Sequence, residues 1–257
     1  MRFVKQIFDF YIQSSIHVAI AVVCLVYITD FSNDLNHLFV YPTCVFFGTI
    51  VGYNFLKYFQ IFQKGNFHHK KYYGILVVSI LSVFGFLFFF LWLETSVQIL
   101  ILVSGLLVFI YPLLRKFGYL KLFFVSLVVT IISVFIPFYI AKRMDSDFYL
   151  TMIQRFLILL SLLIPFEIFD SKTDDQSLQT LPQQFGINST KFFGILLVIL
   201  FIILEYFKVN SSLLSLPIGI ISGLFILFST IERNKYYTSF WVESVPIFWL
   251  LALLFCK

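Results

Sequence analysis

Four carboxylates lie close together near residue 170, and they are the side chains best suited to chemistry. Glu167, Asp170, Asp174 and Asp175 fall within nine residues, although the whole chain has only 13 acidic residues. The first three are spaced i, i+3 and i+7, so on a continuous helix they form one stripe. A divalent cation would relieve their mutual repulsion, and carboxylate oxygens suit Mg²⁺. The cluster predicts a magnesium site, with an ordinary solvated helix end as the alternative.

Glu167 favours the magnesium site over the solvated helix end. It lies within the last turn of an apolar run that covers residues 147–169. An ionisable side chain at such a place is energetically costly unless it is paired or serves a function. The acidic cluster is therefore positioned by an apolar helix, and the rest of the chain shows what kind of protein contains that helix.

The composition indicates a membrane protein. Of the 257 residues, 60% are hydrophobic, 21% are aromatic and only 12% are charged. A soluble domain of this size could not cover its surface with so few charges, and a disordered chain would contain far fewer apolar residues. The formal net charge of +5 is not gathered into a basic stripe, which excludes nucleic acid as a partner. The positive charge instead suits lipid phosphates and cytoplasmic loops.

The chain contains nine apolar stretches, each about long enough to cross a bilayer core. They are continuously apolar, unlike the alternating strands of membrane barrels, and little of the chain remains for a soluble domain. The sequence therefore predicts an all-α, nine-helix transmembrane bundle that forms a single domain over residues 1–257. The predicted spans are residues 12–30, 38–62, 73–93, 97–114, 119–141, 147–169, 190–208, 212–231 and 238–256.

Lys and Arg predict the orientation of these spans. Most of them fall in the N-terminal tail and in the segments that would share its side of the membrane. We therefore expect an integral membrane protein, of the bacterial inner membrane, with its N-terminus in the cytoplasm and its C-terminus outside. The cytoplasmic side then carries three polar segments, residues 63–72, 115–121 and 170–189, and we expect function there.

Two segments resemble those of a known family. Asp170-Ser-Lys-Thr-Asp174, followed by Thr180-Leu181-Pro182 and then Gly186, resembles the second aspartate motif of the UbiA superfamily of intramembrane prenyltransferases. Tyr111-Pro-Leu-Leu-Arg115-Lys116, which closes the fourth predicted span, is similar to the Tyr-x-x-x-Lys/Arg segment of that family. The resemblance extends over nearly the whole chain, because the predicted number of spans and the positions of the polar segments also agree.

The resemblance implies a fold and a reaction. Members of the family form nine-helix bundles around a cavity that opens to lipid, and two aspartate motifs hold Mg²⁺ ions that bind the diphosphate of a long isoprenoid. Loss of the diphosphate leaves an allylic carbocation. By resemblance, this chain would transfer an isoprenoid group from a polyprenyl diphosphate to an aromatic, quinone-precursor or lipid acceptor, with Mg²⁺ on Asp170 and Asp174 and with membrane lipids as its surroundings.

The chain departs from the family at the first aspartate motif, which normally reads Asn-Asp-x-x-Asp-x-x-x-Asp at the end of the second span. Asn54 matches the leading Asn, but Phe55, Tyr58 and Phe62 occupy the positions of the three Asp. Phe169 also replaces the Arg that often precedes the second motif. The alternative function is therefore a catalytically impaired homologue that acts as a membrane lipid-binding or scaffold protein.

Lys57 offers a substitute for the missing acids. It lies about one helical turn from Asn54 and near the cytoplasmic end of the second predicted span. Its ammonium group could offset diphosphate charge where a metal ion would have been. We therefore expect one Mg²⁺ on Asp170 and Asp174, opposed by Lys57 as a further catalytic residue. The alternative is that Lys57 only extends to the membrane interface.

The remaining candidates surround these residues. By resemblance, Glu167 and Asp175 would tune the magnesium site, while Asn54, Arg115 and Lys116 would face the diphosphate. Arg115 and Lys116 could equally be ordinary cytoplasmic charges. Tyr111 would cap a phosphate oxygen or belong to the aromatic belt at the membrane interface.

Two further ionisable residues lie inside predicted spans. His17 is expected either to face a cavity or to be a hydrogen-bonded packing residue. Arg155 is expected to pair with Glu205 or Glu243 elsewhere in the bundle, because an unpaired intramembrane charge is costly.

Overall fold

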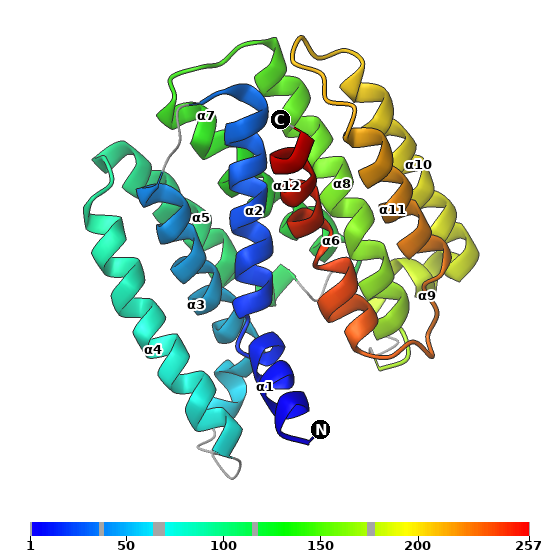
Figure 1. Ribbon diagram of the computed structural model, residues 1–257. Helices are drawn as coiled ribbons and strands as arrows, with labels where there is room; N and C mark the ends of the chain where they lie inside the picture. Colours follow the sequence, from blue (N-terminus) through cyan, green and yellow to red (C-terminus); the bar gives the residue numbers. More distant parts are fainter. Residues whose placement is uncertain (1, 36–38, 64–69, 115–117, 174–177, 257) are drawn as a thin grey trace.

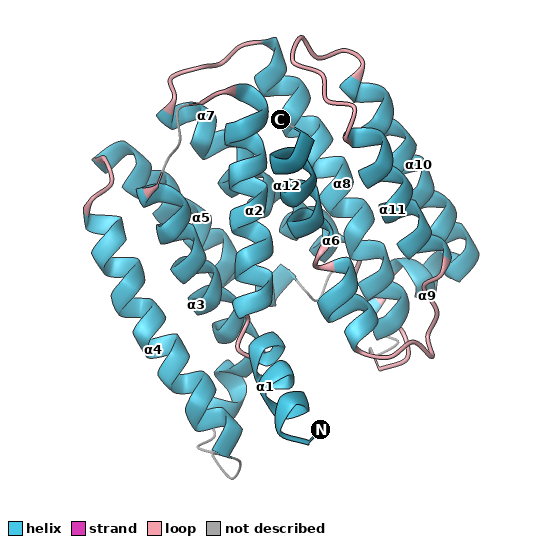
Figure 2. Ribbon diagram, viewed as in Figure 1, coloured by secondary structure: helices cyan, strands magenta, loops and turns pink. Residues whose placement is uncertain are grey.

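A computed structural model describes residues 2–35, 39–63, 70–114, 118–173 and 178–256, and these residues form helices and connecting turns without a strand. Figures 1 and 2 show the helices packed side by side as a bundle. The all-α class predicted from the sequence is therefore confirmed. In chain order the first helices are α1 (Arg2–Gln13), α2 (Ile16–Asn33), α3 (Val40–Gln63), α4 (Lys70–Leu91) and α5 (Thr95–Leu114).

The second half of the chain begins with a helix that contains a π-helical segment. It runs through α6 (Leu120–Thr130), η2 (Ile131–Phe135) and α7 (Ile136–Ile140). The elements that follow are α8 (Ser146–Asp170), α9 (Leu181–Phe185), α10 (Ile187–Glu205), α11 (Ser215–Leu227), the π-helical segment η4 (Tyr237–Val242) and α12 (Val245–Cys256).

Each of the nine apolar stretches is helical over most of its length, but the number of spans is not confirmed. Within the described residues, six helices are long and apolar enough to cross a membrane, and two more apolar helices are shorter. The six are Ile16–Asn33, Tyr72–Leu91, Leu120–Ile140, Ser146–Asp170, Ile187–Glu205 and Tyr237–Phe255, and the shorter ones are Thr95–Tyr111 and Ser215–Leu227. A count of nine stays a prediction.

The N-terminal segment differs from the prediction. The first predicted span starts at residue 12, but the structure ends α1 at Gln13 and begins α2 at Ile16. Ser15 has a left-handed backbone with φ 62°, which breaks the helix between them. Helix α1 has an exposed apolar side at Phe3, Val4 and Ile7. It is therefore a separate amphipathic helix, of the kind that lies along a membrane interface.

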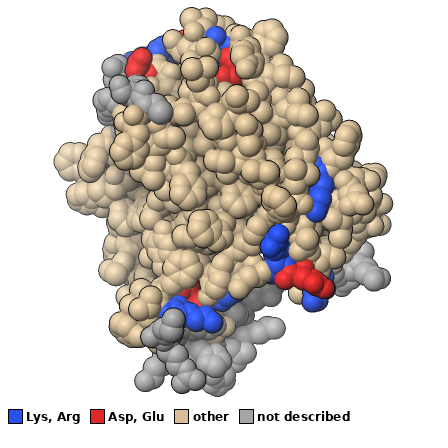
Figure 3. Space-filling model, turned by 45° about the vertical axis from the view of Figure 1, so that its right-hand side comes forward, with Lys and Arg blue, Asp and Glu red and all other residues tan. Residues whose placement is uncertain are grey.

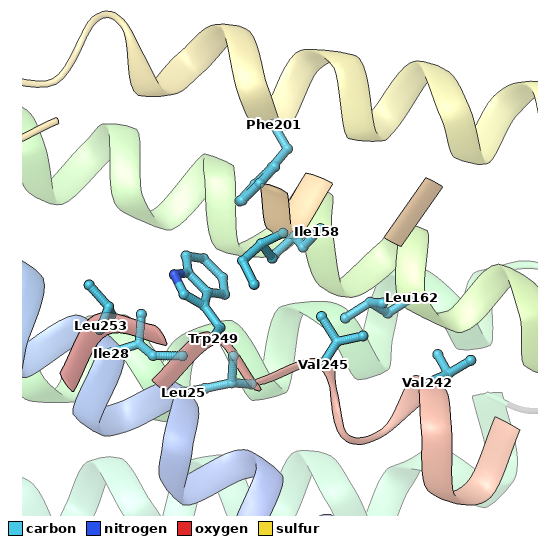
Figure 4. Close-up of a cluster of buried hydrophobic side chains, with 10 residues drawn as sticks. Leu25, Ile28, Ile158, Leu162, Phe201, Val242, Val245, Trp249 and Leu253 are labelled. Carbon is cyan, nitrogen blue, oxygen red and sulfur yellow. The ribbon is translucent and has the colours of Figure 1, made fainter. Parts of the chain in front are cut away.

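The centre of the bundle is an apolar core built from helices far apart in the sequence. Leu25 and Ile28 of α2 pack with Ile158 and Leu162 of α8, and the Trp249 ring of α12 lies among them (Figure 4). Helices α2 and α8 are the most enclosed of the candidate spans, with 67% and 56% of their apolar windows buried, whereas α4 buries only 11% and lies at the edge of the bundle in Figure 1. Glu167 and Asp170 thus lie at the end of one of the two most enclosed helices.

The two ends of the bundle are formed by different elements. The N-terminus, α1, the last turns of α3 and α8, and α9 lie at one end, which we call the α1 end, and the C-terminus lies toward the other (Figure 1). In the face shown in Figure 3, a broad surface without charged side chains separates groups of charged residues near the top and in the lower part. The three polar segments predicted to share one side of the membrane therefore begin or end at the α1 end, and the cytoplasmic location of that end stays a prediction.

Candidate functional site

The end of α8 is held by a buried ion pair. Glu167 is only 3% exposed, and its Oε1 lies 2.7 Å from Nζ of Lys121 in the first turn of α6. This pair neutralises the Glu167 carboxylate and fixes the last turn of α8 against α6. One turn further on, Asp170 is the last residue of α8 and is half-buried. The sequence does not point to Lys121 as a partner of Glu167, because the two residues are 46 positions apart in the chain.

The remaining predicted residues of this region lie outside the described part of the chain. They are Asp174, Asp175, Arg115 and Lys116. Their neighbours nevertheless show that the two polar segments meet. Gly118 has a φ of +56°, and a Cβ there would overlap the carbonyl oxygens of Leu178 and Gln179. The segment after α5 therefore packs directly on the segment after α8, as a site built from both would require.

The Thr-Leu-Pro part of the predicted motif begins a short helix. The Thr180 N–H donates to Oε1 of Gln183 at 3.0 Å, and Pro182 lies in the first turn, where its missing N–H costs nothing. Gly186 follows with a φ of +81°, which separates α9 from α10. This segment turns the chain at the α1 end, so that α10 can return beside α8.

Asn54, the residue that matches the first motif, is a buried connector. It is 1% exposed, and its Nδ2 donates to the Ser14 carbonyl at 3.1 Å and to Ser79 Oγ at 3.0 Å. These bonds join α3 to the α1–α2 turn and to α4. Its Oδ1 has no hydrogen-bond partner among the described residues. Asn54 and Lys57 therefore contact the same α1–α2 turn, at Ser14 and Ser15.

Lys57 lies on the open side of this turn. Its Nζ donates to Ser15 Oγ at 3.3 Å and lies 5.9 Å from the centre of the Tyr53 ring. The side chain is exposed and lines a pocket of about 230 Å³ between α1, α3 and η4. Tyr58, at the position of a family Asp, lines the same pocket and donates its hydroxyl to the Gln13 carbonyl at 2.8 Å. The other lining residues are Asp9, Ile12, Gln13, Lys235, Tyr236 and Ser239.

The wall of this pocket opposite α3 is an ion pair between α1 and the segment before η4. Lys235 Nζ and the Tyr236 hydroxyl each donate to Asp9 Oδ1 at 2.7 Å. The hydrogen bond from Lys235 is the main cause that holds the pKa of the Asp9 carboxyl below its ordinary value of 3.8, and the same bond raises the pKa of Lys235. Asp9 is thus charged and engaged, and the pocket keeps a net positive charge from its two lysines.

A second acidic side chain, Glu243, was expected from the sequence only as a partner of Arg155. It connects η4 to α12 and is half-buried. It interacts electrostatically with Lys57 of α3 at long range. Its occurrence inside the apolar run of residues 238–256 was the signal that could have identified it.

Tyr111 joins α5 to α6 through an aromatic contact. It is half-buried and stacks on Phe124 of α6 with 6.4 Å between ring centres.

His17 and Arg155 have structural partners. His17 is buried and hydrogen-bonds with the Tyr11 hydroxyl at 2.8 Å and the Phe240 carbonyl at 3.1 Å. The pairing expected for Arg155 is not its direct contact. Its guanidinium instead donates to the Leu25 carbonyl at 3.2 Å and to Thr29 Oγ1 at 3.1 Å, and lies 5.1 Å from the Trp249 ring centre.

The described residues do not contain a metal centre of the two-ion kind. Within the part of the chain that the structure describes, no three His, Cys, Asp or Glu side chains are grouped so that they could hold a metal. Phe55 and Tyr58 supply no carboxylate on α3, and Glu167 is engaged by Lys121. A single ion on Asp170 and Asp174 stays a prediction, because only Asp170 is described.

The fold is similar to that of a solved structure. It matches the apo structure of a UbiA homolog from Aeropyrum pernix K1 with a TM-score of 0.65, at 11% sequence identity, over 93% of this chain and 97% of that chain. No protein-family model matches the sequence, and no curated protein matches it. The predicted resemblance in fold is therefore confirmed over nearly the whole chain. At this identity the match shows the fold alone.

Proposed function

We propose that this protein is a UbiA-like membrane prenyltransferase, which moves an isoprenoid group from a polyprenyl diphosphate to an aromatic, quinone-precursor or lipid acceptor. The observation that carries the proposal is the fold, shared with a UbiA homolog over 93% of the chain. Within that fold, a lysine-lined pocket on α3 and an acidic helix end on α8 lie at the same end of the bundle. Opposite charges at one end suit a diphosphate that is held by both a cationic side chain and a metal ion.

On the α8 side, Asp170 and Asp174 would hold one Mg²⁺. Carboxylate oxygens are the donors that Mg²⁺ prefers, and the ion would supply positive charge to the departing diphosphate. The Lys121–Glu167 pair fixes the last turn of α8 and thereby positions Asp170. Asp175, Arg115 and Lys116 are proposed to complete this side, because the contact of Gly118 with Leu178 and Gln179 brings their segments together.

On the α3 side, Lys57 would bind the diphosphate directly. Its side chain is exposed to the pocket, and its contact with Ser15 Oγ at 3.3 Å is weak enough to be exchanged for a phosphate oxygen. A charge-assisted hydrogen bond of this kind is stronger than a neutral one. Asn54 supports the turn that holds Ser15, and Tyr111 is proposed to face the substrate from α5.

The reaction needs the chain to stabilise one bond cleavage. The C–O bond between the isoprenoid and the diphosphate breaks, and its electron pair leaves with the diphosphate, where Lys57 offsets the developing charge. The allylic carbocation that remains would face the interior aromatic rings, among them Tyr53 and Tyr111, whose faces attract cations. The acceptor then supplies the electron pair of the new bond and releases one proton to solvent.

The test is release of pyrophosphate by the full chain in lipid nanodiscs. We expect release when the protein is incubated with Mg²⁺, geranylgeranyl diphosphate and a phenolic acceptor, and we expect Lys57→Met to lower the rate by at least about tenfold. Lys142→Met, an exposed lysine at the opposite end of the bundle, is the matched control and should keep the wild-type rate. No release with any donor would overturn the proposal.

The aromatic side chains on α3 favour a second candidate. Phe55 and Tyr58 replace carboxylates, and Phe55 packs edge-on against Phe109 with 4.9 Å between ring centres. An aromatic surface of this kind suits the binding of an isoprenoid lipid that the protein does not convert. The same assay separates the two functions, because a binder would retain a labelled polyprenyl diphosphate in the nanodisc without releasing pyrophosphate.

A further inference from the structure

Two hydrogen-bond donors of the Lys57 pocket converge on one carboxylate oxygen. Lys235 Nζ and the Tyr236 hydroxyl each lie 2.7 Å from Oδ1 of Asp9. The Lys235 ammonium also lies 4.9 Å from the centre of the Tyr236 ring, so the two donors are held side by side. A cationic donor and a hydroxyl donor aimed at one anionic oxygen can bind a phosphate oxygen in the same way. Asp9 therefore occupies a position that suits an oxygen atom of an anionic ligand.

The Asp9–Lys235 pair is accessible enough to be exchanged. The Lys235 side chain is 53% exposed and the Asp9 side chain is 25% exposed. Both line the pocket of about 230 Å³, so a ligand that enters the pocket reaches them directly. An ion pair in contact with water contributes little net stability, because water and salt screen it. A ligand with more negative charge than one carboxylate can therefore replace Asp9 at these donors.

Helix α1 has other contacts that hold it in place during such an exchange. The ring centre of Phe8 lies 5.4 Å from that of Tyr236 and 5.0 Å from that of Phe240. These aromatic contacts bury apolar surface and do not depend on the charge of Asp9. Rotation of the Asp9 side chain can therefore free both donors while α1 stays docked on the segment around η4.

The charges of the pocket select an anion with several oxygen atoms. Its lining contains two lysines, Lys57 and Lys235, and one acid, Asp9. A cation would be repelled by both ammonium groups, and a single carboxylate would gain little over Asp9 itself. A diphosphate carries more charge than Asp9 and has enough oxygen atoms to accept hydrogen bonds from both lysines and from Tyr236. The pocket therefore suits a diphosphate once Asp9 has moved away.

We propose that Lys235 and Tyr236 bind the diphosphate together with Lys57, and that Asp9 is an internal competitor that occupies their donors until the ligand displaces it. The inference rests on the proposed function, because it names the prenyl diphosphate as the ligand. On binding, the hydrogen bonds of Lys235 and Tyr236 pass from Asp9 Oδ1 to diphosphate oxygens. No covalent bond changes in this exchange. Lys235 and Tyr236 contact the substrate, whereas Asp9 acts only by competing with it.

The test is that removal of the two charges changes binding in opposite directions. The probe is geranylgeranyl thiolodiphosphate, a non-hydrolysable analogue, measured by calorimetry on the full chain in phosphatidylcholine nanodiscs. Asp9→Asn should bind it about threefold to tenfold more tightly, because a competing negative charge is removed. Lys235→Met should bind it about tenfold more weakly, because a charge-assisted hydrogen bond is lost.

The matched control is a second partly exposed ion pair, at the opposite end of the bundle. Arg143 and Asp145 lie 2.8 Å apart, and the Asp145 side chain caps α8. Asp145→Asn keeps a side chain that can cap a helix, and it should leave the affinity for the analogue within about twofold of the wild type.

A pair that only holds α1 in place predicts a different pattern. Asp9→Asn and Lys235→Met would then loosen the same contact, and both would weaken binding or leave it unchanged. Tyr236→Phe keeps the ring contacts and removes one donor, so it should weaken binding by about threefold and carries the test if Lys235→Met does not fold. The inference is overturned if Asp9→Asn does not tighten binding, or if Lys235→Met and Tyr236→Phe both bind like the wild type.

A phospholipid headgroup carries related chemistry, and a second set of nanodiscs separates it from the prenyl donor. When part of the phosphatidylcholine is replaced by phosphatidic acid, the affinity of the wild type for the analogue should stay within about threefold. A larger loss in the wild type that is absent in Lys235→Met would assign the site to the lipid phosphate and overturn the assignment to the prenyl donor.

Turnover separates the failure of this inference from the failure of the proposed function. If the wild type releases pyrophosphate and Lys235→Met keeps the same KM for geranylgeranyl diphosphate, Lys235 does not bind the donor although prenyl transfer stands. If the wild type releases no pyrophosphate but Asp9→Asn and Lys235→Met change analogue binding in opposite directions, the binding site stands and prenyl transfer does not.

Discussion

The last turns of α3 and α8 occupy comparable places at the α1 end of the bundle, but they carry opposite charges. Helix α8 ends in acids, of which Glu167 is paired with Lys121 and Asp170 follows one turn later. Helix α3 has aromatic residues at the corresponding positions and adds Lys57 beside the pocket. Under the proposed function, the bundle would keep a UbiA-like fold while one side of the site has a cation in place of carboxylates.

The difference also concerns how the charges are held. On the α8 side the partner of Glu167 lies within ion-pair distance, and the two side chains are almost completely buried. On the α3 side Lys57 has only a 3.3 Å contact with Ser15, and Glu243 interacts with it at longer range. The α8 pair is buried and holds two helices together, whereas Lys57 is exposed to the pocket and accessible to a ligand.

The largest expected effect concerns rigidity on the α8 side. Lys121→Met would remove the buried cation 2.7 Å from the Glu167 carboxylate, and the free energy of unfolding in detergent should fall by about 3–5 kcal/mol. The double variant Lys121→Met/Glu167→Leu should recover most of the loss, because no charge is then left buried. Equal stability of the single variant and the wild type would show that the pair is not structural.

A smaller effect is expected on the α3 side, where the charge serves a ligand. Lys57→Met should weaken binding of a non-hydrolysable geranylgeranyl diphosphate analogue by about 10–100-fold, because one charge-assisted hydrogen bond is lost. The melting temperature in nanodiscs should change little, in contrast to Lys121→Met. If Lys57→Met lowers the melting temperature and leaves analogue binding intact, the roles of the two sides are wrongly assigned.

Disrupting the contact between the segments after α5 and α8 should lower the free energy of unfolding by less than Lys121→Met does. Gly118→Ala places a Cβ against the carbonyl oxygens of Leu178 and Gln179 at a positive φ, so the free energy of unfolding should fall by about 1–3 kcal/mol. Gly105→Ala, in α5 where a Cβ meets nothing within 4 Å, is the control and should be neutral or slightly stabilising. Equal stability of the two variants would contradict the packing of these segments.

The smallest effect concerns the Asp9–Lys235 pair at the pocket. Both side chains are partly exposed, so Asp9→Asn should cost only about 0.2–1 kcal/mol at neutral pH. The pKa of Asp9 is lowered, so its contribution is complete above the ordinary value of 3.8 and is lost as the pH falls through the lower folded value. The difference in melting temperature between wild type and Asp9→Asn should therefore be constant from about pH 5 to 8 and shrink as the pH falls below the ordinary pKa of 3.8.

Much of the fold could be predicted because the apolar stretches are long and uninterrupted. The helix that ends at Asp170 was predicted to within one residue, and the polar segments do meet at one end. The break at Ser15 could not be predicted, because the left-handed backbone of a single residue, with φ 62°, does not change the hydrophobicity pattern of the sequence. The same holds for the π-helical segments, which depend on local packing.

The candidate site was only partly predictable, because residue type does not reveal neighbours. Lys57 was identified from its position one turn after Asn54, and the structure places it in a pocket. Lys121 was not identified as a site residue, since its partner lies on a helix far away in the sequence. The amide of Asn54 was expected to face a ligand, but in the structure it donates to Ser14 and Ser79.

The central claim is that a lysine on α3 replaces one metal ion, so that a single Mg²⁺ on the α8 side suffices. The most direct measurement is the number of Mg²⁺ ions bound per chain when the full protein in nanodiscs is saturated with a non-hydrolysable geranylgeranyl diphosphate analogue. We expect about one ion in the wild type and in Lys57→Met, and none in Asp170→Asn. Two ions in the wild type, none in the wild type, or one ion that persists in Asp170→Asn would contradict it.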